Sequence, residues 1–231
     1  MTGPWVAPEL LAALPLPWRL ADPVERGKAT RELLPDPQQR AEALQALEMC
    51  LAYLVDVRDR YGDETDWGLP KEFFDDYWFI LYAGLKQSMP TLADVTPERV
   101  RDWAEAYLDP EDVFGASWTT PPDEVVDSIG RSWVFFIVQG ATESLVRWLR
   151  GVGPEHLDDW ERARVVDLLK EATPRLQWRL TIITIPTILD LGGPDQKSYF
   201  DRLANDQGLH EKTRAEAESV SSFIDRAHEP I

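Results

Sequence analysis

Trp133-Val134-Phe135-Phe136-Ile137-Val138 forms the apolar centre of a longer helical pattern, and Trp78-Phe79-Ile80-Leu81 repeats this character earlier in the chain. Such patterns, longer than an ordinary strand and apolar around most of their circumference, indicate helices that are buried. We therefore predict two long central helices, over residues 69–88 and 123–150. The rest of the chain is interpreted outward from this pair.

Helical periodicity continues over most of the remaining chain. Residues 37–61 carry apolar side chains at three- and four-residue steps, namely Ala43, Leu44, Leu47, Leu51, Leu54 and Val55. Thr96-Pro97-Glu98 has the chemistry of a helix start, with a capping threonine, a first-turn proline and an early carboxylate. Gly153-Pro154-Glu155 is interpreted in the same way. The predicted helices in these other regions span 8–14, 22–34, 96–108, 153–172, 194–205 and 209–228.

The segment Thr181-Ile182-Ile183-Thr184-Ile185 is ambiguous, because its β-branched residues suit a strand as well as a buried helix. No second strand candidate is available to pair with it, and an isolated strand would leave its backbone groups unsatisfied. We therefore predict a buried helix here, kinked at Pro186. The apolar stretch Thr181–Leu189 also offers a surface for self-association, which leaves the oligomeric state open.

The predicted fold class is all-α, a compact array of about nine or ten helices in stacked antiparallel pairs. Residues 1–37 contain seven prolines, so only short helices fit there. We expect this segment to be a proline-rich arm packed on the body, since it also carries several large apolar side chains. A recognition tail is the alternative. Residues 38–231 are predicted to form a single all-helical domain.

An internal repeat is a further hypothesis. Pro97 and Pro154 are 57 residues apart, and at this offset nine of the thirty-one pairs between 78–108 and 135–165 are identical. Roughly two identities are expected from average residue usage. The predicted repeat units are 70–108 and 123–172, with Trp103 and Trp160 as equivalent packing residues. Chance similarity between two ordinary helical hairpins is the alternative.

The charge and cysteine content limit the classes of partner. A formal net charge of −17 disfavours nucleic acids and anionic membranes, because both require a surplus of Lys and Arg. It favours a basic protein partner, with nucleic-acid mimicry as a weaker alternative. The single cysteine, Cys50, permits no intrachain disulfide, and no uncharged stretch approaches a membrane span. We therefore expect a cytoplasmic location and interpret the ten tryptophans mainly as packing residues.

Two acidic segments invite metal-site interpretations. Asp63–Gly68 begins like a calcium loop, but Trp67 and Phe74 occupy positions where that loop needs oxygen ligands. Asp75 and Asp76 resemble the first half of a magnesium–diphosphate site, but the matching second half is absent. His156 lies near two aspartates and is better explained as part of a charged helix start. No metal site is predicted.

Other catalytic signatures also fail. The segment Gly115–Trp118 lacks the closing glycine of a nucleophile elbow, and Gly192-Gly193-Pro194 lacks the Lys-Ser/Thr of a phosphate-binding loop. Cys50 lies on an apolar helix face and is interpreted as a core residue. No catalytic residue and no cofactor is predicted.

The leading functional hypothesis is a non-enzymatic protein-interaction module, a scaffold, regulator or inhibitor that presents an acidic surface to a basic partner. The alternative is an enzyme or small-molecule binder with a cavity between helices, because helical bundles draw such sites from scattered positions. The candidate binding residues for that cavity are Asp75, Asp76, Tyr77 and His156.

Overall fold

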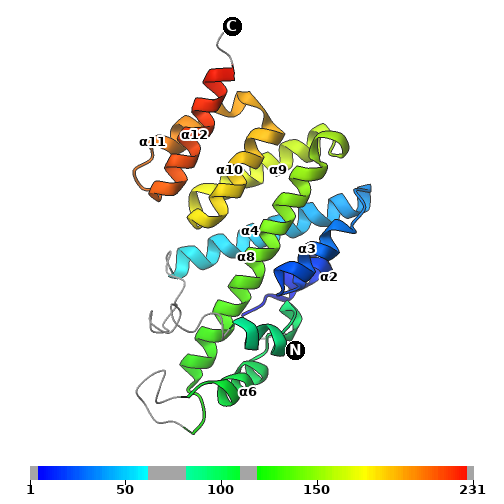
Figure 1. The fold of residues 1–231 in the computed structure, drawn as a ribbon, viewed down its shortest axis with the longest axis vertical. Helices are drawn as coiled ribbons and strands as arrows, with labels where there is room; N and C mark the ends of the chain where they lie inside the picture. The colour runs from blue at the N-terminus through cyan, green and yellow to red at the C-terminus, as the bar shows by residue number, and fades with distance from the viewer. Residues whose placement is uncertain (1–4, 62–81, 110–118, 228–231) are drawn as a thin grey trace. The chain divides into compact units, whose positions relative to one another are not determined.

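The computed structural model describes residues 5–61, 82–109 and 119–227, and the regular structure in this part of the chain is helical (Figure 1). Its ten named α-helices, its three short 3-10 helices and a further helical segment over 82–88 confirm the all-α prediction. The described residues form no strand, and their backbone pairing of the β type is limited to an isolated bridge between Leu20 and Thr91. Of the helix predicted over 69–88, only residues 82–88 are described, and they are helical.

The chain forms two compact units, one of residues 1–32 with 61–141 and one of residues 33–60 with 142–231. The long helix α8 (Asp123–His156) contributes residues to both. The division into an arm of residues 1–37 and a domain of residues 38–231 stays a prediction.

The first unit begins with short helices, as its prolines require. Its named helices are α1 (Pro8–Ala13), α2 (Leu16–Arg19), α3 (Pro23–Arg31), the 3-10 helix η1 (Leu92–Asp94), α6 (Pro97–Tyr107) and the first part of α8. A proline stands in the first turn of α1, α2, α3 and α6, where its missing N–H removes no helical hydrogen bond. The helix predicted to start at Pro97 is confirmed, and Thr96 caps it through a hydrogen bond from Arg99 N.

The stretch Trp133–Val138 lies in the core of this unit, as its composition predicts. Trp133 is fully buried, and its indole N–H donates to the carbonyl of Met89 at 3.2 Å. Its ring stacks on Phe136 with centroids 5.3 Å apart, and Tyr82 meets both rings edge-on. The apolar centre of α8 therefore anchors the aromatic core of the first unit.

The second unit contains most of α4 (Pro37–Tyr61), followed by the end of α8 and the C-terminal helices. These are α9 (Asp159–Ala172), η2 (Thr173–Arg175), α10 (Trp178–Gly192), η3 (Pro194–Gln196), α11 (Lys197–Asn205) and α12 (Glu211–Ala227). α10 packs against both α9 and α12, and α11 packs against α12 (Figure 1).

The ambiguous segment around Thr181 is a helix, and its buried threonines explain why that is stable. The hydroxyls of Thr181 and Thr213 are 3.0 Å apart, and those of Thr184 and Thr173 are 2.9 Å apart. Thr187 donates to the carbonyl of Ile183 at 2.8 Å. Because every one of these hydroxyls has a partner, their burial leaves no unsatisfied polar group. The prediction of a buried helix is confirmed, and Pro186 lies inside it, while the kink at Pro186 stays a prediction.

The predicted helix start at Pro154 is wrong, because α8 continues through Pro154 to His156. α9 begins at Asp159, where a reciprocal capping box fixes its start. The carboxylate of Asp158 accepts from Glu161 N at 2.8 Å, and Asp158 N donates to the Glu161 carboxylate at 2.9 Å. This capping box satisfies two backbone N–H groups at the start of α9. A Pro-Glu pair alone does not form such a box.

The internal repeat is not confirmed. The repeat also matches Phe79 with Phe136, but Phe79 lies outside the described residues, whereas Trp103 and Trp160 are both described. Trp103 is 2% exposed in the first unit, whereas Trp160 is 68% exposed in the second. The prediction that both are equivalent packing residues is therefore wrong for Trp160, because its helix starts at a different point relative to the shared motif.

Candidate interaction surface

Of the predicted binding residues, only His156 belongs to the described part of the chain. Asp75, Asp76 and Tyr77 lie outside the described residues, so a cavity around them stays a prediction. His156 is the last residue of α8 and is exposed. Within the described ranges, no group of three or more His, Cys, Asp or Glu side chains is arranged to hold a metal ion.

Cys50 lies in the core, as predicted, where it is fully buried. Burial raises the pKa of its thiol to about 12, against a smaller opposing effect of its hydrogen bond with Thr142. A thiol with this pKa stays protonated at neutral pH and is a poor nucleophile. Cys50 therefore acts as a small packing residue.

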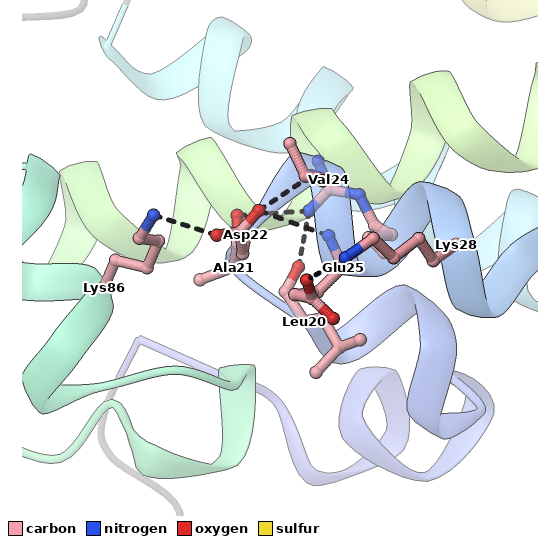
Figure 2. Close-up of polar contacts among 8 residues, drawn as sticks. Leu20, Ala21, Asp22, Val24, Glu25, Lys28 and Lys86 are labelled. Atoms are coloured by element: carbon pink, nitrogen blue, oxygen red, sulfur yellow. Dashed lines mark hydrogen bonds and ion pairs between the residues drawn. The ribbon is translucent and has the colours of Figure 1, made fainter.

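A polar cluster surrounds Asp22 in the first unit (Figure 2). The Asp22 carboxylate accepts from Val24 N at 2.7 Å and from Glu25 N at 3.2 Å, so it caps α3. It also accepts from Lys86 Nζ at 2.8 Å, and this hydrogen bond is the main cause that lowers the pKa of Asp22. The same hydrogen bond raises the pKa of Lys86.

The charged residues near Asp22 also have hydrogen-bond partners within the protein. Arg26 is buried, and its guanidinium donates to the carbonyls of Leu20 and Ala21. Glu25 accepts from Lys28 Nζ at 2.7 Å. The charged groups of this cluster thus neutralise one another or bind backbone, which stabilises the entry to α3.

A surface depression in the second unit runs between α4 and α9, and we call it the α4–α9 groove. It has a volume of about 390 Å³ and is lined by Glu48, Leu51, Ala52, Val55, Asp56, Asp59, Arg164, Leu168, Glu171, Ala172 and Arg175. The first six of these residues come from α4 and the others from α9 and η2.

The floor of the α4–α9 groove is apolar. Leu51, Leu168 and Ala172 are buried beneath it, Val55 is half-buried, and Ala52 is exposed. The apolar floor arises because each helix turns one apolar stripe toward the other, with small side chains leaving space above it. A second apolar face can therefore be buried here.

Two ion pairs cross the groove, one near each end. Glu48 pairs with Arg164 at 2.9 Å, and Asp59 pairs with Arg175. Glu48 and Asp59 are eleven residues apart, and so are Arg164 and Arg175. Because the earlier residue of one segment pairs with the earlier residue of the other, the two segments run in the same direction. The span between the pairs is about 16 Å at 1.5 Å per helical residue.

The two ion pairs that cross the groove contribute little to stability. The side chains of Glu48 and Arg164 are 52% and 40% exposed, and those of Asp59 and Arg175 are 49% and 48% exposed. Solvent-exposed pairs of this kind contribute about 0.2–1 kcal/mol. Their carboxylates can therefore exchange partners at small cost.

The rim of the groove is acidic. Four carboxylates line it, those of Glu48, Asp56, Asp59 and Glu171, against two guanidinium groups. Asp56 also pairs with Arg60 on its own helix, whereas Glu171 has no ion-pair partner among the described residues. The groove combines an apolar floor with an excess of negative charge, which is the combination that favours a basic amphipathic segment.

Sequence reasoning missed this groove because its two sides lie more than a hundred residues apart in the chain. The available signal was the row of carboxylates on one edge of the 37–61 helix, beside Leu51 and Val55. That row indicates an exposed edge, but only packing against α9 turns it into the wall of a groove.

No helix within the described ranges is long and apolar enough to cross a membrane. The chain matches no protein-family model, no curated protein and no solved structure.

Proposed function

We propose that this protein is a protein-interaction module whose α4–α9 groove binds a helix of a basic partner. The observation that supports this most is the apolar floor beneath an acidic rim. An amphipathic helix would bury its apolar face on Leu51, Val55 and Leu168. Its Lys and Arg side chains would pair with the carboxylates at the edges.

The length of the groove suits about three helical turns of the partner. The cross-groove pairs at Glu48 and Asp59 have half-exposed side chains, so a partner cation can replace Arg164 or Arg175 without leaving a buried charge. The groove can therefore accept its ligand without a change in the helices that form it.

The net charge of −17 supports the same partner chemistry at long range. A protein with this charge attracts basic partners and repels acidic ones before contact, which raises association rates at low ionic strength. A cytoplasmic location belongs to this proposal, since the one cysteine is a buried thiol. No observation among the described residues favours the enzymatic alternative over this module.

The first experiment locates the partner on the surface. A photoreactive amino acid is placed at Ala52, which is exposed in the groove, or at Ala215, which is exposed on α12. Both variants are irradiated in a lysate of the native host, and cross-linked proteins are identified by mass spectrometry. A basic protein captured from position 52 and not from position 215 is the expected result.

The second experiment tests the chemistry with the purified partner. Glu171→Lys reverses a charge on the groove rim, and Glu218→Lys makes the same change on an exposed position of α12. We expect Glu171→Lys to weaken binding about tenfold and Glu218→Lys to have little effect, since only the first charge faces the partner. Equal affinities of the two variants, or binding that is insensitive to salt, would exclude the acidic groove as the binding site.

A further inference from the structure

Trp160 stands apart from the other tryptophans of the described residues. Its side chain is 68% exposed on the first turn of α9, whereas Trp18, Trp103, Trp133 and Trp148 are buried. Within the part of the chain that the structure describes, no aromatic ring stacks on Trp160 and no cation lies over it. A large apolar ring exposed to solvent lacks the favourable free energy of burial. A smaller polar residue at this position would not carry that cost.

Trp160 belongs to an exposed face of α9 that we call the α9 crest, formed by Trp160, Ala163, Asp167 and Glu171. Their spacing of three, four and four residues places them along one side of the helix. The opposite side is buried, and there Glu161 pairs with Arg40 at 2.9 Å. The crest therefore presents an indole followed by two carboxylates.

The carboxylates of Asp167 and Glu171 have no ion-pair partner among the described residues. Asp159, next to Trp160, pairs with Arg162, yet its side chain remains 96% exposed. Asp159 is thus the accessible carboxylate beside the indole, whereas Asp167 and Glu171 lie about two and three turns further along α9. The cations between Trp160 and Asp167 are already paired, Arg162 with Asp159 and Arg164 with Glu48.

Arginine matches both parts of this surface. Its planar guanidinium stacks on the face of an indole and can donate hydrogen bonds in its own plane to a carboxylate at the same time. A purely apolar side chain would gain the ring contact but nothing from the carboxylates, and it would leave them closer to a low-dielectric surface.

We propose that the α9 crest is an arginine-binding site, at which an arginine of a protein partner stacks on Trp160 and a second basic side chain pairs with Asp167 or Glu171. Trp160 does not line the α4–α9 groove. Glu171 belongs to the groove rim as well, but Trp160 and Asp167 do not, so arginine binding at these two residues does not require a helix in the groove.

The test uses nuclear magnetic resonance of the full chain labelled with ¹⁵N, in which each indole N–H gives a separate signal. Trp160→Leu assigns the signal of Trp160 and keeps an apolar side chain at that position. The probe is a short capped peptide with two arginines separated by two helical turns. Matched peptides carry lysine, uncharged citrulline or leucine in place of arginine.

We expect the arginine peptide to shift the Trp160 signal saturably, with at least tenfold weaker binding to Trp160→Leu. The lysine peptide should bind more weakly, because an ammonium group stacks less well on a ring. The citrulline peptide should cause no shift. Equal shifts with the leucine peptide, an unchanged affinity of Trp160→Leu, or no shift with arginine would each overturn the proposal.

Two control variants separate this site from the groove and from general surface effects. Phe223→Leu changes another exposed aromatic residue, on α12, and should leave arginine-peptide binding unchanged. Ala52→Arg introduces a bulky cation on the exposed wall of the α4–α9 groove and should also leave it unchanged. Loss of the Trp160 shift in either control would show that the crest alone is not the site.

Discussion

The start of α6 and the junction of α8 with α9 carry the same local motif, Pro-Glu followed by Asp-Trp at the same spacing, yet they use it differently. In α6 the proline is the first helical residue, and Trp103 lies two turns in, buried in the first unit. In the second case the proline still belongs to α8, and Trp160 is the second residue of α9. A motif thus sets the local chemistry, whereas capping sets where a helix starts and therefore which face a residue takes.

The surroundings of the two indoles follow from this difference. A methyl group added at Gly84 would come within 2.7 Å of Trp103 Nε1, so the backbone there approaches the ring closely. Tyr107 stacks on the same ring with centroids 5.8 Å apart. Trp160 has no such setting among the described residues, which makes it available to a partner.

The largest expected contrast is in stability. Trp103→Ala removes a fully packed ring and leaves a cavity, so it should lower the free energy of unfolding by about 3–5 kcal/mol. Trp160→Ala should change it by no more than about 0.5 kcal/mol, because little packing is lost at an exposed site. Urea denaturation followed by circular dichroism measures both. Equal losses would restore the equivalence that the repeat hypothesis requires.

A second contrast concerns glycines before each motif. Gly84→Ala should destabilise the protein by about 1–3 kcal/mol, since the rigid Trp103 ring must move to accept the methyl group. Gly151→Ala should stabilise it by up to about 1 kcal/mol, because alanine favours the α8 helix and nothing lies within 4 Å of the added carbon. Thermal unfolding of the two variants shows the signs directly. A stabilising Gly84→Ala would mean that Trp103 is loosely packed.

A third prediction addresses the helix starts themselves. Thr96→Ala and Asp158→Ala each remove a capping acceptor and should cost about 1 kcal/mol, with the larger loss at Asp158, whose capping box is reciprocal. Glu155→Ala should cost no more than about 0.5 kcal/mol, because no helix begins there. Chemical denaturation of the three variants checks this order. A loss at Glu155 as large as that at Asp158 would favour the Pro-Glu start.

The smallest effect is a pH dependence at the start of α6. The Glu98 backbone N–H, followed by the Thr96 hydroxyl, holds the pKa of the Glu98 carboxyl below its ordinary value of 4.5. Because the folded pKa is the lower one, ionised Glu98 stabilises the fold above about pH 4.5, and this contribution is lost as the pH falls through the folded pKa.

Glu98→Gln should therefore be less stable than the natural protein above that range and equally stable well below it. Thr96→Ala should raise the pKa of Glu98 toward 4.5, which carbon-detected NMR titration can follow. A Glu98 pKa at or above 4.5 in the natural protein would show that the first turn of α6 does not bind this carboxylate.

Much of the helical structure could be predicted from local patterns. The predicted helix over 37–61 coincides with α4, and the Thr-Pro-Glu start of α6 is found where its chemistry indicates. Both succeed because helix periodicity and capping act over a few neighbouring residues. The segment around Thr181 succeeded for a different reason, since the absence of a pairing strand excluded the alternative.

The failures involve choices between neighbouring local signals. Pro154-Glu155 and Asp158–Glu161 are both plausible starts within five residues, and the reciprocal capping box at Asp158 is the one that the fold uses. The burial of Trp103 and the exposure of Trp160 could not be distinguished from their identical motifs. The α4–α9 groove could not be predicted either, because no local pattern joins its two walls.

The sequence by itself thus determined the all-helical fold class and most helix boundaries, because these depend on 3.6-residue periodicity and on caps close by in the chain. The tertiary structure decided which faces are buried, and with them the acidic groove and the exposed Trp160. Burial is a property of contacts between distant segments, and residues such as Glu48 and Arg164 meet only when the helices that carry them pack together.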